Sequence, residues 1–130
     1  MNDQQLFYQQ KLQFEMDSWD LSVALSSGTK ILVIDARSAE AYQKEHIPGS
    51  INIPHRTMTE SSISHLDKEA LVVTYCDGIG CNASTKGALN MVNQGFKVKE
   101  LIGGLDWWKR DGHQTERAGS SGKDPIACGC

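Results

Sequence analysis

Short apolar runs alternate with amphipathic segments along this chain. The runs at 31–34 and 70–73 contain only apolar residues, most of them β-branched, and show no period of two. Such runs are typical of strands that are buried on both faces, as in a parallel sheet. A further strand is predicted at 96–101, and a short one at 50–53, ahead of Pro54.

Helical patterns separate these strands. Helices are predicted in two pieces within residues 4–26, then at 39–45, 83–93 and 105–110. Asp17 or Ser18, and Ser38, are suitable N-caps, and Gly95 is suited to end the helix at 83–93. Residues 55–66 are polar and ambiguous. Strands that alternate with short helices predict βαβ units on a mostly parallel sheet, whose reactive groups gather at the carboxyl ends of the strands.

Length and charge narrow the possible functions. The 130 residues suit one domain, and the net charge of −3 argues against nucleic acid or an acidic membrane as the main partner. No run reaches the ~18 apolar residues of a membrane span. The N-terminal segment MNDQQLFYQQ lacks the basic and apolar regions of a signal peptide. We therefore expect a single cytoplasmic domain over residues 1–130, with reduced cysteines.

The four cysteines form two close pairs, Cys76 with Cys81 and Cys128 with Cys130. This spacing fits reactive thiols or metal ligands better than structural bridges. The tail, residues 113–130, is rich in Gly and Ser, and we expect it to be mobile or draped over the surface. Its two cysteines could relay sulfur, bind a soft metal or simply be exposed thiols. Two cysteines supply at most half of a tetrahedral zinc site, so no metal or other cofactor is expected.

Cys76 directly follows the second apolar strand, at the edge of the sheet where reactive groups gather. The glycines after it, Gly78 and Gly80, allow successive backbone N–H groups to point inward as an anion-binding nest. The helix that begins near Ala83 directs its positive end to the same place, which would stabilise a thiolate. Asp77 opposes this, because an adjacent carboxylate raises the pKa of a thiol. The alternative is that Cys76 is a buried residue at a strand end, followed by a tight turn.

Three segments together resemble the rhodanese domain family, and they cover about residues 19–112 in the family's order. They are Asp35-Ala36-Arg37-Ser38 with Glu40, Tyr42, His46-Ile47-Pro48-Gly49-Ser50 and Asn52-Ile53-Pro54; Cys76 at the end of an apolar strand; and Gly95-Phe96 with Val98, Gly103-Gly104-Leu105-Asp106-Trp107-Trp108 and Gly112.

The resemblance implies a three-layer α/β fold, with a central, mostly parallel five-stranded sheet flanked by helices. It also implies a thiosulfate sulfurtransferase-like cycle. Cys76 would take sulfane sulfur from thiosulfate, a polysulfide or another persulfide, carry it as a persulfide, and pass it to cyanide, a thiol or a partner protein. Asp35 and Arg37 would support the site through ionic or backbone hydrogen bonds, and Trp19 would belong to the core. The anionic sulfur would be bound by the loop residues Asp77, Gly78, Ile79, Gly80, Cys81 and Asn82.

The loop departs from the family's usual pattern. Ile79 and Cys81 occupy places that commonly hold a glycine and an arginine, and no Lys or Arg occurs between Cys76 and Lys86. A loop without that cation recruits an anionic donor poorly, so a neutral or protein-bound persulfide is an equally good candidate. Related phosphatases and arsenate reductases need an arginine where this chain has Asn82, so their activities are not expected.

Cys81 has two interpretations. It could be a resolving thiol that attacks a persulfide or sulfenic acid on Cys76, provided that the two Cα atoms lie within about 7 Å. It could instead pack under the loop as a small residue, which we favour. A second functional hypothesis is a non-catalytic rhodanese-like module that binds a partner or senses redox state through both cysteines. That hypothesis predicts a Cys76–Cys81 disulfide without turnover.

Overall fold

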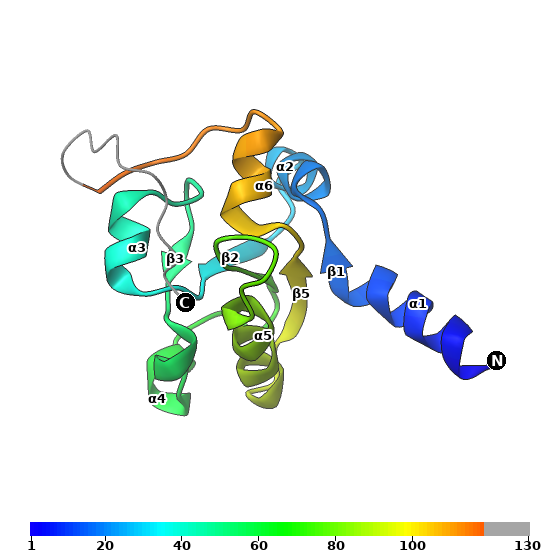
Figure 1. Cartoon of the computed structure of the whole chain (residues 1–130). Coiled ribbons are helices and arrows are strands. Elements are labelled where there is room, and N and C mark those ends of the chain that lie inside the picture. The colour runs from blue at the N-terminus through cyan, green and yellow to red at the C-terminus, as the bar shows by residue number, and fades with distance from the viewer. Residues whose placement is uncertain (119–130) are drawn as a thin grey trace.

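The two apolar runs form the centre of a parallel sheet. In the computed structural model, which describes residues 1–118, β2 (Ile31–Asp35) and β4 (Leu71–Tyr75) pair along their whole length. The outer strands are β5 (Lys97–Leu101), β1 (Glu15–Met16) and β3 (Ile51–Asn52). The strand order is β1-β5-β4-β2-β3, and every neighbouring pair is parallel (Figure 1). The predicted α/β fold with a five-stranded sheet is therefore confirmed.

Helices cover both faces of this sheet (Figure 1). Their bounds are α1 Asp3–Phe14, α2 Ser18–Ser26, α3 Ala39–Lys44, α4 Glu60–Ile63, α5 Ala83–Asn93 and α6 Gly104–Arg110, with a 3-10 turn, η1, at His55–Thr57. Side chains of α4 and α5 pack in one core cluster, and those of α2 and α6 pack in another. The sheet is thus the middle layer of three.

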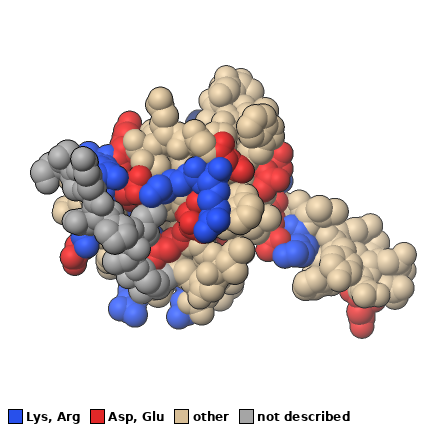
Figure 2. Space-filling model, turned by 45° about the horizontal axis from the view of Figure 1, so that its top comes forward, with Lys and Arg blue, Asp and Glu red and all other residues tan. Residues whose placement is uncertain are grey.

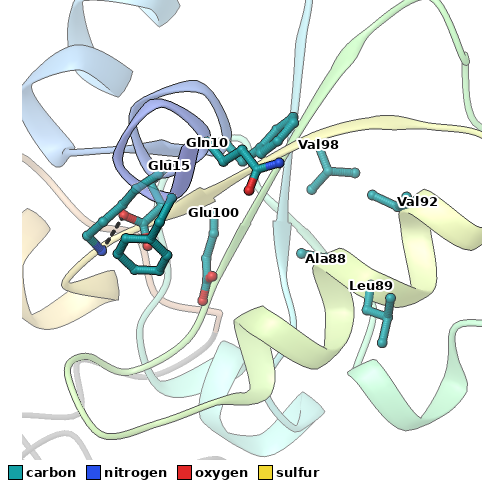
Figure 3. Close-up of a pocket in the computed structure, with 10 residues that line it drawn as sticks. Gln10, Glu15, Ala88, Leu89, Val92, Val98 and Glu100 are labelled. Carbon is teal, nitrogen blue, oxygen red and sulfur yellow. Dashed lines mark hydrogen bonds and ion pairs between the residues drawn. The ribbon is translucent and has the colours of Figure 1, made fainter. Parts of the chain in front are cut away.

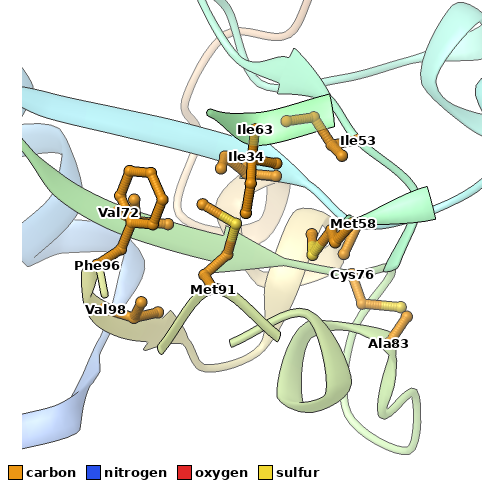
Figure 4. Close-up of a cluster of buried hydrophobic side chains, with 11 residues drawn as sticks. Ile34, Ile53, Met58, Ile63, Val72, Cys76, Ala83, Met91, Phe96 and Val98 are labelled. Atoms are coloured by element: carbon orange, nitrogen blue, oxygen red, sulfur yellow. The ribbon is translucent and has the colours of Figure 1, made fainter. Parts of the chain in front are cut away.

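Adjacent residues of β4 show why the apolar runs lack a period of two. Val72 packs with Met91 of α5 on one face (Figure 4), whereas Val73 packs with Leu21 and Leu105 on the other. Because both faces of the central strands are buried, every position in them favours an apolar side chain.

The capping residues in the sequence predicted most helix ends correctly. The Asp17 side chain accepts a hydrogen bond from the Asp20 N–H, and Ser38 accepts one from the Ala41 N–H, so both act as N-caps. Gly95 follows α5 with φ +91°, a conformation that favours glycine. The ambiguous residues 55–66 contain η1 and α4. The two-residue strand β1 was not predicted, because a pair of residues is too short to show a pattern.

Trp19 does not belong to the core, contrary to expectation. Its side chain is 63% exposed, whereas Leu21 in the same helix is fully buried. Residues two apart on an α-helix lie about 200° apart around its axis, so α2 cannot bury both on one core face. Trp108 of α6 is buried in the cluster that Leu21 joins.

The described part of the tail lies against α3 and α6. Trp108 Nε1 donates to the Gln114 carbonyl at 2.8 Å, and His46 and Glu116 exchange backbone hydrogen bonds of 2.9 Å. Cys128 and Cys130 lie outside the described residues.

Helix α1 extends from the body of the protein and buries none of its residues (Figure 1). Within residues 1–118, no helix has both the length and the apolar character needed to cross a bilayer.

Candidate active site

The two central strands end side by side at the carboxyl edge of the sheet. Asp35, the last residue of β2, is opposite Tyr75, the last residue of β4. The Ala36 N–H donates to the Tyr75 carbonyl at 3.0 Å just beyond the strands. This register brings the loop that contains Arg37 next to the loop that begins at Cys76.

Arg37 is a buried cation that joins these two loops. Its Nε and Nη2 donate to the Asp35 carboxylate at 3.0 and 2.7 Å, and Nη2 also donates to the Glu45 carbonyl at 2.6 Å. Its Nη1 donates to the Asp77 carboxylate at 3.0 Å. Burial lowers the pKa of Arg37, but Asp35 and then Asp77 outweigh it, so the pKa is raised and the group stays charged. The fork geometry of guanidinium suits this bridging role.

The contact with Arg37 changes the expected effect of Asp77. As a lone carboxylate beside Cys76, Asp77 would disfavour a thiolate. In the structure it faces the guanidinium, and its backbone carbonyl accepts from the Asp106 N–H at 2.7 Å. Its charge is therefore partly offset, and its backbone and side chain both hold the start of the loop.

Cys76 is fixed at the end of β4. Its side chain is 1% exposed and belongs to the core cluster under α5 (Figure 4). Its carbonyl accepts from the Leu105 N–H at 2.9 Å, at the start of α6. Gly104 has φ +55°, and a Cβ there would collide with this carbonyl, so only glycine fits. The start of α6 thus positions the backbone of Cys76.

The loop after Cys76 turns back and returns Cys81 to it. The Cys81 N–H donates to the Gly78 carbonyl at 3.2 Å, and Gly80 adopts φ +95°. Contrary to the expectation of reduced cysteines, a disulfide joins Cys76 and Cys81, whose Cα atoms lie 6.3 Å apart. This separation satisfies the condition set for a resolving thiol. Cys81 also packs against the core cluster, as a small residue under the loop would.

The structure places the predicted anion-binding residues around this turn. Ile79 is at the tip, where its side chain is 88% exposed. Asn82 is the N-cap of α5, and its carbonyl accepts from the Lys86 N–H at 3.0 Å. The Cys81 N–H is already engaged by Gly78, so in the disulfide state it does not join the other amides as an anion donor. Binding of sulfur by this loop stays a prediction.

A small cavity of about 180 Å³ opens beside the two cysteines. The loop, the end of β5 and the start of α6 line it, and Glu15 and Glu100 add carboxylates. Ser84 Oγ and Thr85 Oγ1 each donate to Glu100 Oε2 at 2.7 Å. Among the residues of 1–118 that line the cavity, none is Lys or Arg. The cavity therefore disfavours a multiply charged anion.

A larger cavity, of about 470 Å³, lies between α1 and α5 (Figure 3). Leu89 and Val92 contribute to its mostly apolar wall, and Glu100 lines it between Glu15 and Ala88 (Figure 3). Glu15 and Glu100 line both cavities, whereas within residues 1–118 no cysteine lines the larger one. On the face shown in Figure 2, Lys and Arg side chains lie next to Asp and Glu side chains.

Ligand atoms of Cys76, Asp77 and Cys81 lie within 4.8 Å of one another, which is close enough to share a metal ion. Metal ligation requires thiolates, and the two sulfurs are joined as a disulfide. Asp77 is paired with Arg37. In the disulfide state the two sulfurs are therefore not available as metal ligands.

Sequence reasoning missed three residues that shape the site. Tyr75 accepts the Ile47 N–H at 3.1 Å, and burial, together with Asp35, raises its pKa, so it stays a neutral phenol. Glu45 accepts from Lys109 Nζ at 2.9 Å, next to Arg37. Glu100 lies near the end of β5, the neighbour of β4. Its position near the end of a predicted strand could have marked Glu100 as a site residue. The role of Glu45 could be recognised only from its contacts in the structure.

Comparisons with known proteins agree with this geometry. The family model of the rhodanese-like domain matches residues 20–111. The chain is 34% identical over 105 residues to thiosulfate sulfurtransferase GlpE of Coxiella burnetii, covering 79% of this chain and 90% of the relative. It superposes on the BH2092 protein of Bacillus halodurans with a TM-score of 0.83 at 40% identity, covering 90% and 88% of the two chains. The rhodanese-like domain of the Alr3790 protein from Anabaena sp. gives a TM-score of 0.70 at 26% identity, over 87% and 91% of the chains.

Proposed function

The chain belongs to the family of rhodanese-like domains, and from this premise we propose that it is a sulfurtransferase that carries sulfane sulfur as a persulfide on Cys76. The Cys76 thiolate attacks the sulfane sulfur of a donor, and the bond from that sulfur to the rest of the donor breaks, so that the remainder leaves with the electron pair, as sulfite from thiosulfate or as a thiolate from a persulfide. A thiol, cyanide or a protein acceptor then attacks the outer sulfur and removes it, which restores the thiolate.

The position of Cys76 carries this proposal. It lies at the carboxyl end of β4, beside a cavity, with its backbone held by Leu105 and Gly104. A nucleophile gains from such fixation because its attack needs little reorganisation. Arg37, held by Asp35, offsets the charge of Asp77 next to the thiol. Gly78, Ile79, Gly80 and Asn82 would direct their amides at the terminal sulfur once the disulfide is reduced.

We propose that the preferred donor is a neutral or protein-bound persulfide rather than thiosulfate. The cavity beside Cys76 contains Glu15 and Glu100 and, among its described lining residues, no cation. Glu15 is paired with Lys11 at 2.7 Å, so Glu100 supplies most of the repulsion of a dianion, which is strongest at low ionic strength. Thiosulfate should therefore be used with a high KM that falls as salt is added.

Intact-mass spectrometry of the reduced full-length protein tests the proposal. The reduced protein is incubated with thiosulfate, a polysulfide or an organic persulfide. The wild-type protein should then show a change of mass that maps to Cys76, whereas Cys76→Ser should show none there. Cys81→Ser is the matched variant, because it changes the neighbouring thiol and leaves Cys76 in place; it should gain one sulfur atom at Cys76. The absence of any Cys76-dependent sulfur uptake, with every donor and in both wild type and Cys81→Ser, would refute the proposal.

A further inference from the structure

We propose that Cys81 is a resolving cysteine, so that the protein also reduces sulfane sulfur to hydrosulfide. This inference rests on the proposed persulfide at Cys76 and adds a second outcome for it. In ordinary transfer, an external acceptor removes the outer sulfur. In the second route, Cys81 attacks the inner sulfur, Cys76 Sγ, and the outer sulfur leaves.

The step balances in atoms and electrons. The Cys81 thiolate forms a bond with Cys76 Sγ, and the bond between Cys76 Sγ and the outer sulfur breaks. The outer sulfur leaves with both electrons of that bond as hydrosulfide, keeping the persulfide proton. The cysteine pair is oxidised by two electrons as the sulfane sulfur is reduced to sulfide. A dithiol then reduces the disulfide by exchange and is itself oxidised to a disulfide.

The geometry of the two cysteines supports this step. Their Cα atoms lie 6.3 Å apart and their sulfurs are joined, so the product of the step fits the fold. The turn that returns Cys81 is closed by its N–H bond to Gly78 and by the positive φ of Gly80. An intramolecular thiol held in this way competes well with acceptors from solution, because its effective concentration is high.

The surroundings of Cys76 also favour an internal thiol over an external anion. The cavity that Cys76 lines also contains Glu100, whose carboxylate disfavours an anionic acceptor such as sulfite, whereas Glu15 is paired with Lys11. Cys81 lines the same cavity and already lies beside Cys76, so it does not have to enter from solution.

The difference in exposure between the two cysteines suits reduction of the disulfide by an external dithiol. Cys76 is 1% exposed, whereas Cys81 is partly exposed on the loop next to Ile79, which is itself 88% exposed. A dithiol can therefore reach Cys81 Sγ more easily than Cys76 Sγ. Attack at Cys81 releases Cys76 as the thiolate, which is the form needed for the next donor.

A single-turnover experiment on the full-length protein tests the inference. Reduced protein is freed of thiols, kept anaerobic, and loaded with a polysulfide or thiosulfate whose transferable sulfur is isotopically heavy. After rapid removal of excess donor, labelled hydrosulfide and protein mass are followed with time. Wild type should release about one labelled hydrosulfide per chain, lose two hydrogens relative to the reduced protein, and give a Cys76–Cys81 peptide.

Three variants separate the possible outcomes. Cys81→Ser should keep its labelled sulfur on Cys76 and release it only when a dithiol is added. Cys76→Ser should take up no sulfur there. The double variant Cys128→Ser/Cys130→Ser removes the tail thiols and should behave as wild type. If wild type holds the persulfide as long as Cys81→Ser does, or if its disulfide maps to the tail cysteines, the inference is wrong and the sulfurtransferase proposal stands. If no variant takes up sulfur, the sulfurtransferase proposal itself fails.

Discussion

The loops that follow β2 and β4 leave the sheet side by side, yet they are stabilised by different means. The first is held by a buried ionic network in which Arg37 binds Asp35, Asp77 and the Glu45 carbonyl. The second is held by backbone contacts with α6, by a glycine with positive φ, and by the disulfide. A loop locked by buried charges cannot change without a large penalty, whereas a loop closed by a reducible bond can.

The two loops are therefore suited to different tasks. The loop after β2 forms a frame, and under the proposed function the loop after β4 would open and close as its thiols react. The Arg37–Asp77 ion pair is the link between them. Substitutions in the frame should therefore change stability most, and substitutions in the thiol loop should change reactivity most.

The largest effect on stability is expected from Arg37→Ala. The change leaves Asp35, which is fully buried, without its counter-ion. Loss of one partner of a buried pair costs about 3–5 kcal/mol of unfolding free energy. Urea denaturation of the protein measures this loss. Arg110→Ala is the matched control, because Arg110 and Asp106 form an exposed pair, and it should cost no more than about 1 kcal/mol. Equal losses in the two variants would contradict the framework role of Arg37.

Asp77→Asn should have a smaller effect on stability and a clear effect on reactivity. It replaces the charged acceptor of the Arg37 hydrogen bond with a neutral amide oxygen, so the cost should be only part of the about 1.5–3 kcal/mol that such a charged bond is worth. Without the adjacent carboxylate, more of the reduced Cys76 should be thiolate at pH 7, so iodoacetamide should alkylate it faster. Asp106→Asn, which removes an exposed carboxylate near Gly78, is the control. Alkylation that is no faster in Asp77→Asn than in the control would show that the two loops are not coupled in this way.

Gly80→Ala should weaken the thiol loop by about 1 kcal/mol, because alanine is strained at a positive φ even where space is open. It should also make the Cys76–Cys81 disulfide easier to reduce in equilibrium with a dithiol. Gly28→Ala is the control, since Gly28 also has positive φ and open space but lies far along the chain from the cysteines. The control should lose similar stability without a change in the disulfide equilibrium. A shift of equal size in both would contradict the role of Gly80 in closing the turn.

Lys109→Met should have the smallest effect, and one that depends on pH. Burial raises the pKa of Glu45, but hydrogen bonds from Lys109 and Thr115 outweigh it, so the pKa lies below its ordinary value of 4.5. A carboxylate whose pKa is lowered by folding stabilises the folded protein at pH values above its ordinary pKa. The stabilisation is lost as the pH falls through the folded-state pKa. Lys109→Met should therefore cost up to about 1 kcal/mol at pH 7 and less in acid.

Thermal unfolding at a series of pH values measures this difference. Lys44→Met is the control, because the Lys44–Glu40 pair is exposed and long, at 3.8 Å. Its cost should be near zero at every pH. A cost in Lys109→Met that stays constant from neutral to acid pH would show that Glu45 is not stabilised as described.

The sequence predicted the elements whose signal is local. The apolar run at 31–34 lies within β2, and the pattern at 83–93 coincides with α5, because each pattern is set by neighbours in the chain. The exposed Trp19 and the two-residue strand β1 were not predicted, since the first depends on which face of α2 meets the core and the second on pairing with β5. Cys76 and the glycine loop after it could be recognised as a candidate site from the sequence, because the strand, the thiol and the turn follow one another along the chain.

By itself, the sequence determined the parallel α/β fold, the family and the position of Cys76 at the carboxyl end of a buried strand. Only the tertiary structure decided how Asp77 and Cys81 act. Asp77 lies 40 positions from Arg37, and only the register of β2 against β4 brings their side chains into a 3.0 Å contact. Cys81 is close to Cys76 in sequence, but their bond depends on the path of one turn, which is set by backbone dihedrals and by contacts with α6. Pattern along a chain reports burial and periodicity, whereas charge pairing and disulfide geometry depend on distances in space.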